Sequence, residues 1–220
     1  MTSLVPPTVF VVDDDCDMRD SLVILLRALD RPVMEFESAE AFYEFYQAPL
    51  PGCLILDIRM TGQSGLELYS ALIEAGKRIP VIFMTAHATV STAVAAMKTG
   101  AIEFLEKPFD PQTLLQKVDT ALAMDATWRD SERRFQSLNE LIQNLSRADR
   151  ETLMMLLRGD TNKSMSLQLD ITERAVELRR QRLMQRLGVR SLAELLDLTI
   201  THRVMEEYRN MTETWRSHNS

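Results

Sequence analysis

The stretch Thr8–Asp15 reads TVFVVDDD, and the stretch Cys53–Met60 reads CLILDIRM. Each starts with an apolar run of the length of a buried strand and then reaches acidic residues. Three further apolar runs lie at 33–36, 81–84 and 102–105, and amphipathic stretches lie between the runs, at 17–29, 39–46, 65–73, 90–98 and 111–123. This alternation predicts βαβ units in an α/β domain, a doubly wound five-stranded parallel sheet complete by about residue 124.

Acidic residues follow two of the expected strands. Asp13 and Asp14 come directly after the first run, and Asp57 comes directly after CLIL. Ligands of open parallel sheets bind at the carboxyl ends of strands, so neighbouring strands would bring these three acids together. Crowded carboxylates require a cation, and an all-oxygen set of this kind suits Mg²⁺. Such a metal would also neutralise an incoming phosphoryl group.

Two more expected strand ends complete this set. Thr85 follows VIFM, and its hydroxyl can donate to a phosphoryl oxygen. Lys107 follows the run around AIEFL and precedes a proline, so a cis Lys107–Pro108 bond is expected. Each residue alone has an ordinary structural explanation, such as capping a helix. Together, a carboxylate nucleophile, a divalent metal, a hydroxyl and a cation suffice to form and hold an aspartyl phosphate. Of the other nearby acids, Asp17 is expected to cap the next helix, and Asp15 has no assigned role.

The second half of the chain has a helical pattern. Residues 112–145 contain neither Pro nor Gly, which predicts a long helix leaving the first domain. A break near Asp125 and a continuous helix both remain open, as do a flexible connector and a dimerising helix. Four helices are then expected, about 146–157, 161–169, 172–187 and 191–203, with caps at Ser146, Thr161, Thr172 and Ser191. The last dozen residues are polar and are expected to fray.

The third of these helices carries an arginine-rich face. Val176, Leu183 and Leu187 should face the core, and at about 100° per residue Arg174, Leu178 and Gln181 lie roughly opposite. A short helix, a turn and this basic helix match the helix-turn-helix plan, in which the second helix enters the major groove of DNA. The competing interpretation is a solvated surface stabilised by pairs four residues apart.

Charge is divided unevenly between the halves. Residues 1–127 hold 9 Lys and Arg against 18 Asp and Glu, which gives −9, whereas residues 128–220 hold 16 against 14, which gives +2. The total of −7 therefore does not argue against nucleic acid as a partner of the second half. No membrane span or signal peptide is expected, and the two cysteines lack metal-ligand spacing. A cytoplasmic location is expected, without a membrane partner.

The motifs FVVDDD, LILDIRM, VIFMTAH and FLEKPF resemble the receiver domain of two-component response regulators over residues 7–124. DIRMTGQSGLEL and AVAAMKTGAIEFLEKPFD are most similar to the FixJ-like branch of the FixJ/NarL family. The resemblance implies a flavodoxin-like fold with Asp57 as phosphoacceptor. It implies Asp13, Asp14, Asp57 and the Arg59 carbonyl as Mg²⁺ ligands, and Thr85 and Phe104 as the switch pair.

Two positions depart from the receiver pattern. Thr61 stands where the family usually has Pro, so a looser turn is expected there without loss of chemistry. His87 lies at a position where the family varies the rate of dephosphorylation.

The stretch from Leu145 to Ile200 resembles the LuxR-type DNA-binding domain through TNK, ITERAVE and LMQRLGVRSLAELL. The resemblance implies four helices, the third for recognition and the fourth for dimer contact. Contacts with DNA are implied for Thr161, Lys163, Thr172, Arg174, Arg179 and Arg180, and proximity to base edges for Glu177, Leu178 and Gln181. Ser164–Ser166 and Arg179 differ from the residues usual in this family, so the family's base specificity cannot be carried over to this chain.

The expected protein is a response regulator with a receiver (1–124), a helical linker (125–145), a LuxR-type domain (146–208) and a polar tail (209–220). A sensor histidine kinase would phosphorylate Asp57 and so change dimerisation or domain arrangement, which controls binding to promoter DNA and transcription. A homodimer is expected on phosphorylation, and RNA polymerase is a further candidate partner. The only expected catalysis is the protein's own phosphorylation and dephosphorylation. One alternative is a helical output that acts by protein contact; another is a related phosphatase, which would need an acid where Arg59 stands.

Overall fold

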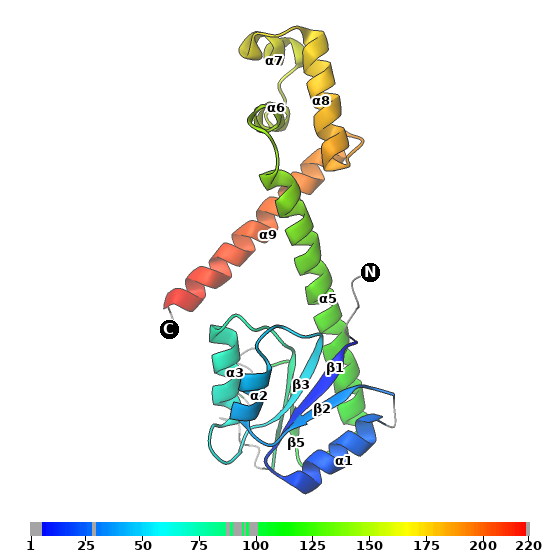
Figure 1. The fold of residues 1–220 in the computed structure, drawn as a ribbon, viewed down its shortest axis with the longest axis vertical. Coiled ribbons are helices and arrows are strands. Elements are labelled where there is room, and N and C mark those ends of the chain that lie inside the picture. Colours follow the sequence, from blue (N-terminus) through cyan, green and yellow to red (C-terminus); the bar gives the residue numbers. More distant parts are fainter. Residues whose placement is uncertain are drawn as a thin grey trace. The chain divides into compact units, whose positions relative to one another are not determined.

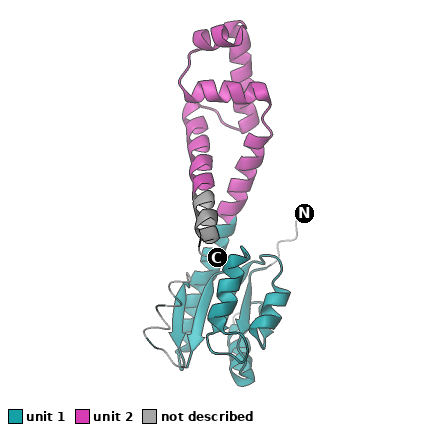
Figure 2. Cartoon of the chain, turned by 90° about the vertical axis from the view of Figure 1, so that its left-hand side faces the viewer, with its two compact units in different colours: residues 1–129 teal, residues 130–220 magenta. Residues whose placement is uncertain are grey.

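The chain forms two compact units, residues 1–129 and 130–220, shown in different colours in Figure 2. The computed structural model describes residues 6–27, 30–86, 89, 94, 96 and 101–218, and for residues 208–218 the backbone only. Most of the expected helix at 90–98 and the residue His87 lie outside the described residues. The two units are considered one at a time below.

A five-stranded parallel sheet forms the centre of unit 1 (Figure 1). Its strands are β1 (Thr8–Val12), β2 (Val33–Phe36), β3 (Gly52–Asp57), β4 (Val81–Thr85) and β5 (Glu103–Glu106). The five parallel strands were predicted; they lie in the order β2-β1-β3-β4-β5, which makes β1 and β3 neighbours. Val12 pairs with Leu56 across β1 and β3, so the acids that follow these two strands emerge side by side.

Alternate residues of each strand face opposite layers of helices. Helices α2 (Ala39–Phe45) and α3 (Gly65–Glu74) cover one face, where Phe10, Leu56 and Phe83 are buried. Helix α1 (Cys16–Arg27) and the first part of α5 (Pro111–Gln143) cover the other face, over residues such as Val11 and Ile55. Burial on both faces explains why the strands read as continuous apolar runs in the sequence.

Helix α5 continues without a break at Asp125. The Asp125 carboxylate is buried and accepts a 2.9 Å hydrogen bond from the Gly52 amide at the start of β3. Arg129 pairs with Asp125 at 2.8 Å and donates to the Pro49 and Leu50 carbonyls. These contacts extend unit 1 to residue 129, five residues past the expected boundary at 124.

Unit 2 contains α6 (Arg147–Leu157), α7 (Asn162–Leu169), α8 (Glu173–Leu187) and α9 (Leu192–His218). Ser146, Thr161 and Thr172 cap the first three, and Gly188 ends α8 in a left-handed conformation, as the sequence predicted. The four helices enclose a third core, which includes Leu153, Met165, Val176, Leu183 and Leu195.

The expected helix end near residue 203 is wrong, because α9 runs to His218. No Gly or Pro follows Gly188, so nothing in the sequence terminates the helix. His202 on α9 stacks on Phe135 of α5 with ring centroids 5.4 Å apart, and its Nε2 lies 3.1 Å from Asn139 Oδ1. Much of the expected linker is therefore packed within unit 2.

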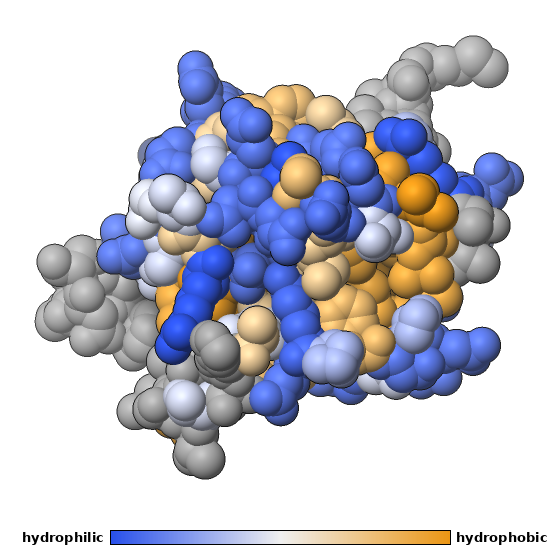
Figure 3. All heavy atoms as spheres, turned by 90° about the horizontal axis from the view of Figure 1, so that it is seen from below, coloured by the Kyte–Doolittle hydropathy of each residue, from blue (hydrophilic) through white to orange (hydrophobic). Residues whose placement is uncertain are grey.

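Figure 3 shows one face of the molecule, on which hydrophilic residues cover most of the area and hydrophobic residues gather toward one side. Among the described residues, no helix combines the length and apolar character that crossing a membrane requires.

Candidate functional site

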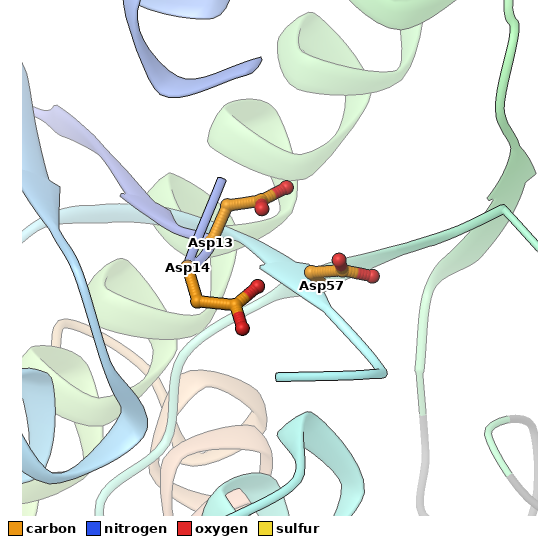
Figure 4. Close-up of side chains that lie close together, drawn as sticks. All are labelled: Asp13, Asp14 and Asp57. Carbon is orange, nitrogen blue, oxygen red and sulfur yellow. The ribbon is translucent and has the colours of Figure 1, made fainter. Parts of the chain in front are cut away.

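Three carboxylates meet at the carboxyl ends of β1 and β3. Asp13 and Asp14 follow β1 and Asp57 ends β3, and Figure 4 shows the three side chains at these neighbouring ends. One oxygen from each lies within 4.8 Å of the others. Asp13 is fully buried and Asp57 is 7% exposed, whereas Asp14 is exposed. The convergence expected from the strand ends is thus present, and all the atoms facing one another are hard oxygen donors.

The Lys107 ammonium lies between two of these acids. Its Nζ is 2.7 Å from Asp13 Oδ2 and 3.1 Å from Asp57 Oδ2. Lys107 comes directly after β5, its amide donates to the Thr85 carbonyl at 2.8 Å, and its bond to Pro108 is cis as expected. One cation therefore compensates two largely buried carboxylates.

Burial and neighbouring charges have competing effects on the pKa values of Asp57 and Lys107, and both net shifts are upward. Burial raises the pKa of Asp57, the nearby Lys107 charge lowers it, and the Asp13 charge raises it again, with a net rise. Burial lowers the pKa of Lys107, but its hydrogen bonds and charge interactions with Asp13 and Asp57 outweigh burial, and the net shift is upward. The charged form of the lysine is thus favoured by its two carboxylate neighbours, whereas burial makes the Asp57 carboxylate harder to ionise than a free one.

Asp14 is held by a different residue, Thr61. The Thr61 amide and hydroxyl both donate to Asp14 Oδ2, at 2.8 Å and 2.7 Å. The Thr61 side-chain and backbone hydrogen bonds lower the pKa of Asp14. The expected looser turn stays a prediction, but Thr61 also connects the loop after β3 to the end of β1, which the sequence did not indicate.

The expected roles of the neighbouring acids also need correction. Asp15, not Asp17, caps α1: its Oδ1 accepts from the amides of Asp17 and Met18 at 2.9 Å and 3.3 Å. Helix α1 begins at Cys16, so Asp17 lies in its first turn and cannot occupy the position before the first helical residue.

The remaining expected residues of the pocket lie on adjacent strands and loops. Arg59 is exposed, and its amide donates to Asp57 Oδ1 at 3.4 Å. Thr85 is fully buried at the end of β4, and Phe104 is a half-buried residue of β5 that pairs with Phe83. The two expected switch residues thus belong to neighbouring strands.

Close packing also fixes the backbone at Asp57. A Cβ added to Gly65, the first residue of α3, would lie 2.1 Å from the Asp57 carbonyl oxygen. Only glycine permits the start of α3 to approach β3 this closely. Because Gly65 has no Cβ, α3 can begin against β3, and this packing helps to set the position of the Asp57 backbone.

A second candidate site lies on α7 and α8. Val176, Leu183 and Leu187 are buried as the apolar stripe predicted, and the opposite face of α8 remains open. Expected contact residues that are exposed are Thr161, Lys163, Thr172, Arg174, Glu177, Leu178 and Gln181. Arg179 and Arg180 are half-buried. The short helix, turn and longer basic helix form the geometry of a helix-turn-helix.

Several of these DNA-facing groups are held by internal contacts. The Thr161 and Thr172 hydroxyl oxygens each accept a 3.2 Å bond from an amide of the helix they cap. Arg180 donates to Asn162 Oδ1, which links α8 to the start of α7. No local sequence pattern indicates this partner of Arg180, because 18 residues separate the two. The same holds for the Thr61–Asp14 contact, which joins residues 47 positions apart.

Fold and sites together define a receiver joined to a helix-turn-helix domain, and comparisons with known proteins agree. The model of the response regulator receiver domain matches residues 9–119, and that of bacterial regulatory proteins of the luxR family matches residues 143–199. The chain belongs to the response regulators with a LuxR-type DNA-binding domain, and it is a transcriptional regulator of that family.

Individual relatives resemble nearly the whole chain. The transcriptional regulatory protein TdiR of Thauera aromatica is 38% identical over 86% of this chain and 83% of its own. The transcriptional regulatory protein FixJ of Azorhizobium caulinodans is 38% identical over 87% of this chain and 91% of its own. Among solved structures, the response regulator StyR gives a TM-score of 0.82 at 41% identity, over 89% of this chain and 98% of its own.

Proposed function

We propose that Asp57 is the phosphoacceptor of this regulator and that its phosphorylation by a sensor histidine kinase controls DNA binding. The observation that carries the proposal is the meeting of Asp13, Asp14 and Asp57 within 4.8 Å, with Lys107 bonded to two of them. A carboxylate nucleophile beside a fixed cation is the arrangement that phosphoryl transfer requires.

The three carboxylates fit Mg²⁺, since they are oxygen donors that already converge on one point. Asp13, Asp14 and Asp57 would hold the ion, and the Arg59 carbonyl would supply a backbone ligand. When bound, Mg²⁺ would neutralise negative charge on the phosphoryl oxygens.

In the proposed transfer an Asp57 carboxylate oxygen attacks phosphorus, and the phosphorus–nitrogen bond of the kinase phosphohistidine breaks with its electron pair returning to the imidazole. Lys107, already 3.1 Å from Asp57, would pair with a phosphoryl oxygen. Thr85, at the end of the neighbouring strand β4, would donate its hydroxyl to another, and Phe104 would change position with it. Phosphorylation can shift the population toward the active conformation only as far as these contacts stabilise it more than the inactive conformation.

We assign DNA binding, which this switch would control, to the exposed face of α8. Arg174 and Gln181 lie on it beside the apolar Leu178, which is 46% exposed and can contact a thymine methyl group. Lys163, Arg179 and Arg180, with the hydroxyls of Thr161 and Thr172, would contact phosphates, and Glu177 would lie near base edges. Two such helices of a homodimer would bind half-sites one helical turn apart.

A stripe of exposed apolar residues on α9 supports a homodimer. Leu192, Leu196, Ile200 and Val204 follow one another at intervals of four and are 43%, 36%, 59% and 58% exposed. Residues spaced in this way lie along one side of a helix, and burying them against a second copy would remove apolar surface from water.

The test compares the wild type with Asp57→Asn in the presence and absence of Mg²⁺ and acetyl phosphate. Intact-protein mass, sedimentation and binding to a pool of genomic DNA fragments are measured at one fixed salt concentration. We expect one added phosphoryl group, more dimer and tighter binding in the wild type only. Asp20→Asn, an exposed aspartate of α1, is the control and should behave as the wild type.

Equal DNA binding in all samples would show that the output is constitutive. The absence of binding to any fragment would favour an output that acts by protein contact instead. Charge reversal at Arg179 and Arg180 separates these cases, because a regulator that acts by protein contact would keep its regulation.

A further inference from the structure

Thr61 makes two hydrogen bonds to one of the acids of the pocket. Both of its donors, the amide and the hydroxyl, reach the same oxygen, Asp14 Oδ2, at 2.8 Å and 2.7 Å. The two residues are 47 positions apart and belong to different loops, one after β1 and the other after β3. This is a tertiary contact between the two loops that border the pocket.

The other two acids are fixed by other means. Asp13 and Asp57 are buried and share the Lys107 ammonium, at 2.7 Å and 3.1 Å. Asp14 is exposed, and Thr61 donates two hydrogen bonds to its side chain. Without these bonds, the exposed Asp14 carboxylate would sample several rotamers in water. Binding an ion would then cost the entropy of ordering that side chain.

The geometry leaves Asp14 suited to binding an ion. Both Thr61 bonds go to Oδ2, so Thr61 does not use the lone pairs of Oδ1. Asp14 lies within 4.8 Å of Asp13 and Asp57 with these bonds in place. A hydrogen bond to the second oxygen of a ligating carboxylate orients it, and losing such a partner commonly weakens metal binding.

We propose that Thr61 is a positioning residue that holds the Asp14 carboxylate toward the pocket and thereby strengthens binding of a divalent cation. The inference rests on the proposed function, since it needs the cation site at Asp13, Asp14 and Asp57. Thr61 thus contributes to the cation site through its side chain, although it lies in an exposed turn.

The test measures the Mg²⁺ dissociation constant by titration calorimetry on the full chain, without a phosphoryl donor. Thr61→Val removes the hydroxyl and keeps the shape, Thr61→Ser keeps the hydroxyl, and Thr61→Pro removes both donors. Thr61 is exposed, so these changes should leave the fold intact, which circular dichroism checks.

Thr113→Val is the matched control. Thr113 also donates its amide and hydroxyl to one aspartate oxygen, Asp110 Oδ2, at 2.9 Å and 3.0 Å, but Asp110 is not one of the pocket acids. We expect the dissociation constant to rise about tenfold in Thr61→Val, the lower end of such effects, and further in Thr61→Pro. Thr61→Ser and Thr113→Val should match the wild type.

The remaining outcomes would overturn the inference in distinguishable ways. Equal affinity in wild type and Thr61→Val would refute the positioning role and leave the proposed function intact. Tighter binding in Thr61→Val would show that the hydroxyl competes with the ion. A wild type that binds no Mg²⁺ and gains no phosphoryl group would remove the proposed function together with the inference.

Discussion

The Asp125 carboxylate on α5 accepts a 2.9 Å hydrogen bond from the Gly52 amide, 73 residues earlier in the chain. Gly52 begins β3, the strand that ends at Asp57, and both Gly52 and Asp125 are buried. The same carboxylate pairs with Arg129, which also binds the loop before β3. One buried acid therefore links the helix to the strand that ends at Asp57.

Replacing Asp125 by Ala should destabilise unit 1, because it leaves a buried amide unsatisfied and a half-buried arginine without its partner. A cost of about 1–3 kcal/mol is expected for such an orphaned group. Differential scanning calorimetry measures it as a lower Tm. Asp130→Ala, an exposed aspartate of the same helix, is the control, and equal effects of the two substitutions would contradict the buried role of Asp125.

Asp57→Asn should stabilise the metal-free protein at neutral pH. The pKa of Asp57 is raised in the folded state, chiefly by burial, so the folded protein keeps this proton to higher pH than the unfolded chain does. Its contribution to stability is therefore full below the unfolded pKa and is lost as the pH rises through the folded pKa. The Asn side chain carries no charge, so the mutant avoids this loss of stability at neutral pH. The difference in stability between mutant and wild type should vanish in acid.

Thermal unfolding between pH 4 and pH 8 in EDTA checks this prediction. The expected gain in Tm at neutral pH is a few degrees, since 1 kcal/mol corresponds to roughly 2–8 °C for domains of this size. Excess Mg²⁺ should raise the Tm of the wild type more than that of Asp57→Asn. A mutant less stable than wild type at pH 8 would show that the negative charge is already fully compensated by Lys107.

Arg180 should contribute a phosphate contact that does not depend on DNA sequence. Its pairing with Asn162 fixes the guanidinium at the junction of α7 and α8. Arg180→Gln should weaken binding to all fragments alike and reduce the slope of log K against log salt by roughly 0.9. Arg147→Gln, whose side chain is 94% exposed on α6, should leave the slope unchanged. A loss confined to particular sequences would instead indicate a base contact.

The dimer proposed for α9 should be sensitive to charge on its apolar stripe. Ile200→Glu removes an apolar side chain that is 59% exposed in the single chain. Burial of such a residue contributes about 1.5–3 kcal/mol, so dimerisation should weaken about tenfold or more. Sedimentation with and without acetyl phosphate measures this effect. Thr201→Glu, an exposed neighbour on the same helix, should dimerise normally.

The strands and the acidic pocket could be predicted because they depend on local patterns. The apolar runs predicted the strands. Asp13, Asp57 and Lys107 lie just past these runs, which predicted that their side chains meet. The parallel sheet turns such strand-end positions into spatial proximity. The roles of these residues in phosphoryl transfer stay predictions, whereas their convergence is confirmed.

Contacts that depend on two distant segments could not be predicted. Thr61 meets Asp14 only once β1 and β3 are paired, and Asp125 meets Gly52 only once α5 has packed on the sheet. The helix cap was misassigned for another reason: Asp15 and Asp17 are both good cap residues, and only the start of α1 at Cys16 decides between them. The predicted length of α9 is too short, because the polar residues after 203 resemble those of an irregular tail.

Helix α8 separates the residues that maintain the fold from those that would read DNA. Its core contacts depend on Val176, Leu183 and Leu187, while Arg174, Leu178 and Gln181 point away from that core. Substitutions at the outward positions should cost little stability. A duplicated copy of this gene could therefore acquire a new set of target promoters through a few changes on one helical face, while keeping its fold and its response to the signal.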